Sequence, residues 1–102
     1  MFALRAVMLA HYSFAFALIK ASWVILLTEA SGIRLSARNQ LSGTVQEVTT
    51  GAVNSEVLLK LADGNVITAI ITNGSAQNLG LAAGKTAIAA FKASSVIVGV
   101  KT

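Results

Sequence analysis

The sequence predicts an all-β fold: a small, five-stranded OB-like Greek-key barrel with one short helical turn, plus N-terminal strands left from a preceding repeat. Three observations indicate this. Short segments rich in β-branched residues alternate with turn sequences over residues 43–100. "DGN" between two of these segments is typical of a tight hairpin. Finally, "IKASWVIL" at 19–26 returns almost unchanged as "FKASSVIV" at 91–98. The length of 102 residues suits one packed domain.

The first element is an apolar stretch over residues 6–27, for which two interpretations compete. About 20 apolar residues can cross a bilayer, and a basic residue before such a run is typical of an export signal. Lys20 counts against a membrane helix, because a lysine near its centre costs about 3 kcal/mol on insertion scales. A hydrophobic anchor or signal segment therefore remains the alternative interpretation.

The competing interpretation rests on the repeated block. Shifting the first half by 72 residues places Lys20 on Lys92 and Ser22 on Ser94. Self-similarity at a fixed offset indicates a repeated structural unit. We therefore expect residues 1–34 to be part of a preceding repeat and residues 35–102 to be one complete domain. Residues 15–26 should form β structure packed on the barrel.

The complete unit divides into strands at 43–48, 54–61 and 65–72, followed by a break in the pattern. In that break Ser75 can cap a single helical turn through Leu79. Two further strands are expected, at about 85–92 and 95–100. This order fits a barrel of the oligonucleotide-binding type. Because an open sheet of this size would expose its edges, we expect closure or pairing between subunits.

Five segments of the chain resemble one known family in their order and spacing: "SARNQLSGTV", "GAVNSEV", "ITAIIT", "LGLAAGK" and "FKASSVIV". The family is that of the Mop proteins, also called molbindins or molybdate-type TOBE domains. The resemblance covers residues 35–100 and implies reversible binding of molybdate or tungstate in the cytoplasm, with no cofactor. It also implies a homo-oligomer, since single-domain relatives form ring-like hexamers. The segment before "SARNQ" looks like the junction of a tandem pair, although the first copy's own "SARNQ" segment and hairpins are missing.

The resemblance also implies which residues hold the anion. A tetrahedral dianion leaves water only if charged and neutral donors replace its hydration. The implied donors are Ser36, Arg38, Thr72 and Lys92, with Asn39, Ser75, Ser94 and Lys20 as further candidates. Ordinary roles compete with this one: either cation can be a solvated surface charge, and the hydroxyl residues can serve as turn or cap residues. We expect the pockets to lie between subunits.

Composition narrows the remaining function classes. The chain has no cysteine and one histidine, which excludes thiolate and multi-histidine metal sites. No motif suggests a catalytic grouping, so we expect a binding protein and not an enzyme. The net charge of +4 is shared evenly by residues 1–35 and 36–102. A nucleic-acid-binding barrel is the main alternative, but Phe91 is the only aromatic residue after Trp23 on which a base could stack.

Overall fold

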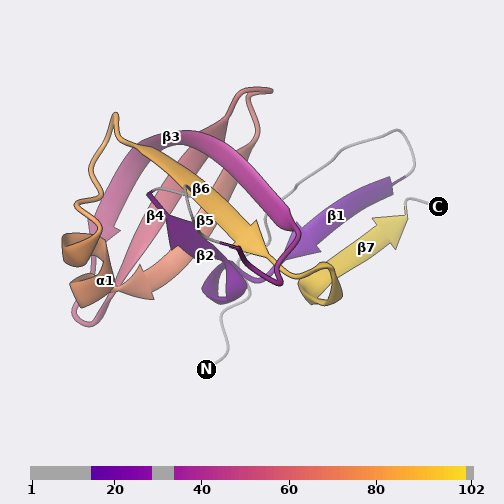
Figure 1. The fold of residues 1–102 in the computed structure, drawn as a ribbon, viewed down its shortest axis with the longest axis horizontal. Coiled ribbons are helices and arrows are strands. Elements are labelled where there is room, and N and C mark those ends of the chain that lie inside the picture. The colour runs from indigo at the N-terminus through magenta and orange to yellow at the C-terminus, as the bar shows by residue number, and fades with distance from the viewer. Residues whose placement is uncertain (1–14, 29–33, 101–102) are drawn as a thin grey trace.

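The computed structural model describes residues 15–28 and 34–100, and its elements are almost all strands (Figure 1). In chain order they are β1 (Ala15–Ile19), the 3-10 turn η1 (Ala21–Trp23), β2 (Ile25–Leu27), β3 (Asn39–Thr50), β4 (Asn54–Leu61), β5 (Val66–Thr72), α1 (Asn73–Asn78), β6 (Thr86–Phe91), the 3-10 turn η2 (Ala93–Ser95) and β7 (Val96–Val100). The all-β fold with one short helix is confirmed.

Five of the strands form one curled antiparallel sheet in the order β2-β6-β3-β4-β5. The remaining two, β1 and β7, pair with each other as a separate antiparallel ribbon. Figure 1 shows this ribbon projecting from the side of the curled sheet, next to the end of β6.

The strand that completes the sheet is not the one expected from the sequence. We expected residues 95–100 to be the fifth strand, but β7 lies outside the sheet and β2 occupies the position beside β6, with Ile25 opposite Ala90. Residues 24–26 and 96–98, where the two strands begin, differ only in Leu26 against Val98, so either segment offers similar apolar residues for this position. The order of strands along the chain therefore could not decide between them.

Strand β3 is shared between two neighbours. Its first half, Asn39–Thr44, pairs with β6, and its second half, from Gly43 onward, pairs with β4. A bulge between Val45 and Glu47 adds the bend that such a long strand needs to curl with the sheet. Gly43 is required at the crossing, because a Cβ atom there would lie 2.5 Å from the carbonyl oxygen of Lys60. The bend sends the two ends of β3 to different ends of the barrel.

The predicted hairpin turn and the predicted helical turn both form, but the helix has a different N-cap residue from the one expected. At the hairpin, Gly64 has a φ of 90°, and the carboxylate of Asp63 accepts a hydrogen bond of 2.9 Å from the backbone N–H of Asn65. Helix α1 begins earlier than expected, because Thr72 and not Ser75 is its N-cap residue. Thr72 ends β5 in an extended conformation and so has the backbone geometry of a cap.

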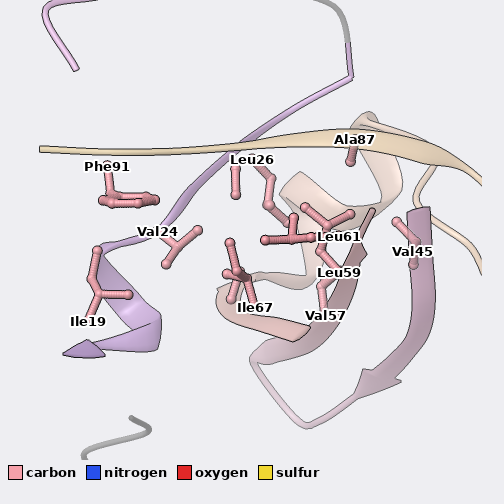
Figure 2. Close-up of a cluster of buried hydrophobic side chains, with 12 residues drawn as sticks. Ile19, Val24, Leu26, Val45, Val57, Leu59, Leu61, Ile67, Ala87 and Phe91 are labelled. Atoms are coloured by element: carbon pink, nitrogen blue, oxygen red, sulfur yellow. The ribbon is translucent and has the colours of Figure 1, made fainter. Parts of the chain in front are cut away.

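The core joins both halves of the sequence. Its buried residues come from β1, β2 and the segment between them as well as from β3 to β6, and are Ile19, Val24, Leu26, Val45, Val57, Leu59, Leu61, Ile67, Ala69, Ala87, Ala89 and Phe91. Figure 2 shows Ile19 and Val24 in the same part of the cluster as Phe91. The prediction of β structure at residues 15–26 is confirmed, with the η1 turn between the strands. Packing on the barrel is confirmed for Ile19, Val24 and Leu26, whereas β1 pairs with β7 outside the curled sheet.

No helix among the described residues is long and apolar enough to cross a membrane. The interpretation of residues 1–34 as part of a preceding repeat stays a prediction, and residues 1–14 lie outside the described part of the chain.

Candidate oxyanion site

Two turns of almost identical backbone geometry carry Lys20 and Lys92. Each lysine precedes a three-residue 3-10 turn and accepts a hydrogen bond of 2.9 Å at its carbonyl oxygen, from Trp23 N–H in the first turn and from Ser95 N–H in the second. The matching "KAS" sequences thus build matching structures. We refer to residues 20–23 as the first KAS turn and residues 92–95 as the second.

The two turns occupy matching places in the strand topology. Ile19 is opposite Val96 in the β1–β7 ribbon, and Ile25 is opposite Ala90 in the β2–β6 pair. Each turn joins a strand of the ribbon to a strand of the curled sheet: the first turn lies between β1 and β2, and the second lies between β6 and β7.

The segment that carries the predicted ligands Ser36 and Arg38 lies at the same end of the barrel as Lys92. Asn39, the first residue of β3, is opposite Phe91, the last residue of β6. Arg38 and Lys92, which flank this pair, therefore lie at the same end of two adjacent strands. Ala37 is buried, and its carbonyl oxygen accepts a 3.1 Å hydrogen bond from Gln40 Nε2, which fixes the approach to the strand.

The side chains at this end of the barrel form an open cationic surface. Ser36, Arg38, Lys92 and Ser94 are exposed, whereas Asn39 and Lys20 are partly buried. The ammonium group of Lys20 lies 5.4 Å from the centre of the Trp23 ring. Charged donors and hydroxyls together can replace the hydration of a small anion. Because Ser36, Arg38, Lys92 and Ser94 are open to solvent in the single chain, a further surface is needed to enclose an anion.

Thr72 and Ser75 lie elsewhere. Thr72 is opposite Asn54, beyond the far end of β3 from Asn39. Its Oγ1 accepts a 3.1 Å hydrogen bond from Ser75 N–H and donates a 2.8 Å bond to Ser75 Oγ. Within one chain the structure thus brings Ser36, Arg38, Asn39, Lys92, Ser94 and Lys20 to one end of the barrel and does not bring Thr72 or Ser75 there.

Two surface hollows lie away from the cationic end. One of about 330 Å³ is lined by Ser42, Gly43, Thr44, Lys60, Leu61 and Ala62. Another of about 150 Å³ lies beside α1, and no cationic side chain lines it. Neither includes the predicted ligands, and the second lacks the positive charge that a dianion needs. Among the described residues, no group of three or more His, Cys, Asp or Glu side chains could hold a metal ion.

The sequence analysis did not identify Trp23 as a neighbour of the site. The repeat contained the signal, because Trp23 and Ser95 are the one mismatch between residues 20–25 and residues 92–97. A ring beside a lysine is a recognised pairing for a cation, but spacing alone did not show that the two side chains meet.

Comparison with known proteins finds a matching domain family and relatives that are named for molybdenum. The profile of the TOBE domain matches residues 35–98. The chain is 52% identical over 87 residues to the molybdenum transport protein ModE of Herbaspirillum seropedicae, covering 85% of this chain and 32% of that protein. It is 41% identical over 69 residues to a probable molybdenum-pterin-binding protein of Haemophilus influenzae, covering 68% of this chain and all of that protein.

Solved structures give the same result. The chain resembles the cytoplasmic molybdate-binding protein ModG, in a form with molybdate bound, with a TM-score of 0.83 and 52% identity over 85% of this chain and 62% of that chain. It also resembles MopII from Clostridium pasteurianum, with a TM-score of 0.60 and 42% identity over 63% of this chain and 96% of that one. The chain thus spans about a third of the ModE relative and matches almost all of MopII.

Proposed function

Because the chain belongs to the TOBE domain family, in its molybdenum-binding Mop branch, we propose that it binds molybdate or tungstate reversibly and without catalysis. The observation that carries the proposal is the meeting of Arg38 and Lys92 at adjacent strand ends, in a fold shared with a molybdate-bound relative. These two cations can supply charge-assisted hydrogen bonds to a dianion.

We assign the anion to pockets between copies of the chain. Ser36, Arg38 and Lys92 supply one wall, with Asn39, Ser94 and Lys20 nearby. Thr72 and Ser75 sit at the far end of the same barrel, so they reach this anion only from a second copy. The exposure of Arg38 and Lys92 in the single chain supports this assignment, since a second copy would remove them from water and strengthen their bonds to the anion.

The proposed biological role is intracellular molybdenum homeostasis in the cytoplasm, through storage, sensing or a part in transport. Relatives named for molybdenum transport and for molybdenum-pterin binding support this range of roles, and one structural relative is described as cytoplasmic. We propose a homo-oligomer, with a hexamer-like ring as the expected form, and no nucleic-acid partner for this domain.

Isothermal titration with molybdate, tungstate, sulfate and phosphate tests the proposal. Molybdate and tungstate should each give a heat of binding that saturates. Arg38→Ala and Lys92→Ala should each weaken binding by about 2 to 4 kcal/mol, the scale for losing one partner of a buried charged hydrogen bond. Arg38→Lys should recover only part of this loss, because an ammonium group lacks the planar fork of a guanidinium.

Lys60→Ala is the matched control. It removes the same unit of charge from an exposed side chain beside the 330 Å³ hollow, away from the cationic end. Its affinity for molybdate should stay close to that of the unmodified protein. The proposed function fails if molybdate and tungstate give no heat with the intact oligomer. The site assignment fails if Arg38→Ala and Lys60→Ala bind equally well.

A further inference from the structure

The two KAS turns share a backbone but differ in one side chain. Lys20 and Lys92 both have extended conformations, with φ and ψ of −67° and 128° for the first and −83° and 144° for the second. The backbone N–H of the last residue of each turn donates the same 2.9 Å hydrogen bond to the carbonyl oxygen of its lysine. That last residue is Trp23 in the first turn and Ser95 in the second.

The indole of Trp23 gives Lys20 a partner inside its own turn. The Lys20 ammonium group lies 5.4 Å from the ring centre, within the range of a cation–π interaction. Trp23 is 49% exposed, so its ring lies at the surface. Ser95, at the matching position, has no ring to offer Lys92. The two lysines therefore start from different states before any ligand arrives.

The packing around the first turn keeps Trp23 beside Lys20, so the difference between the two turns remains. The first turn packs against β5 and its Ala21 is fully buried, whereas Ala93 at the matching position is exposed. Packing of the first turn fixes the backbone on which Trp23 and Lys20 stand. The ring is thus held beside the ammonium group by a well-supported turn.

An anion that uses Lys20 must draw the ammonium group away from the ring or share it with the ring. Trp23 also replaces a hydroxyl, and the indole N–H is its only polar group. The first turn consequently loses one oxygen donor and gains a competitor for its cation. Both changes weaken anion binding at the first turn.

We propose that Trp23 is a positioning residue that makes the two KAS turns unequal, holding Lys20 on its ring so that the first turn binds the oxyanion more weakly than the second. This proposal rests on the function proposed above and adds to it a residue that sets the affinity of the site. The second turn, with Ser95, is the stronger of the two.

A double-mutant cycle on the titration tests the coupling of Trp23 to Lys20. Trp23→Ser should tighten molybdate binding about 2- to 5-fold, the range that an exposed cation–π interaction of that kind accounts for. In a Lys20→Met background, which keeps the stem of the side chain but not its charge, Trp23→Ser should change the affinity less than 2-fold. Trp23→Phe should give an intermediate affinity, because phenylalanine is a weaker partner for a cation than tryptophan.

Proton NMR supplies a readout that a purely structural role would not move. The side-chain CH₂ protons next to the Lys20 ammonium group should be shifted upfield by the indole ring. The shift should vanish in Trp23→Ser and decrease when molybdate is added to the unmodified protein. The matching protons of Lys92 should show no such shift in either protein.

The outcomes separate the two proposals. If the unmodified protein gives no heat with molybdate, the proposed function fails and this inference fails with it. If molybdate binds but Trp23→Ser has the same effect with and without the Lys20 charge, or has no effect, only the role of Trp23 is overturned. A Lys20 upfield shift that persists unchanged at saturating molybdate would also overturn it.

Discussion

The position of β2 beside β6 makes a quantitative prediction about Leu26. This side chain is 6% exposed and belongs to the core cluster, whereas its neighbour Ile25 is 52% exposed. Leu26→Ala removes three buried carbon groups, worth about 2.4 kcal/mol in transfer free energy at 0.8 kcal/mol each. The cavity adds to this, so we expect the free energy of unfolding to fall by about 3 kcal/mol.

Ile25→Ala is the matched control, because it deletes the same number of carbon groups from the adjacent residue of the same strand. Half of that side chain already contacts water, so the loss should be about 1 kcal/mol. Urea unfolding followed by far-ultraviolet circular dichroism measures both. All variants must be compared at one protein concentration, since self-association would make the apparent stability depend on it.

A difference of about 2 kcal/mol between the two variants, with unchanged slopes in urea, is the expected result. Equal losses for Leu26→Ala and Ile25→Ala would refute the reasoning, because they would mean that residues 25–27 are not the strand that completes the sheet. A Leu26→Ala protein as stable as the unmodified one would refute it as well.

Two further predictions concern the backbone and the helix cap. Gly43→Ala should destabilise the protein by about 1 to 3 kcal/mol, because its new Cβ would meet the Lys60 carbonyl. Gly74→Ala in α1, with open space around it, should be neutral or stabilising by up to about 1 kcal/mol. Thermal unfolding of the two variants measures both effects, and a larger loss of stability for Gly74→Ala than for Gly43→Ala would contradict the prediction. Thr72→Val should cost about 1 kcal/mol of stability through the lost N-cap, with urea unfolding as the measurement. It should also weaken molybdate binding by about 1 kcal/mol, because the proposed pocket loses a neutral donor; unchanged stability would contradict the cap role, and unchanged affinity would remove Thr72 from the proposed pocket.

The sequence by itself determined the elements and the family. The predicted strand at 54–61 matches β4, and the strands predicted at 65–72, 85–92 and 95–100 match β5, β6 and β7 to within one residue at each end. These boundaries follow from local causes: β-branched runs, the Asp63-Gly64 turn and the Asn73-Gly74 pair after β5. The repeat at 19–26 likewise showed that the apolar N-terminal stretch contains strands.

Local pattern did not determine the start of β3 at Asn39, four residues before the predicted strand. Those residues pair with β6. When a strand is lengthened by pairing with a segment distant in sequence, its own residues give little indication of where it begins, because its hydrogen bonds depend on the tertiary fold.

Only the tertiary structure decided which strand completes the barrel and which candidate ligands meet. Residues 24–26 and 96–98, where β2 and β7 begin, differ only in Leu26 against Val98, so this local sequence does not specify which strand lies beside β6; pairing and packing with distant segments do. The same long-range pairing sets Arg38 beside Lys92 and carries Thr72 to the far end of β3. A motif indicates which side chains can bind an anion, but the register of strands distant in sequence decides which of them share one surface.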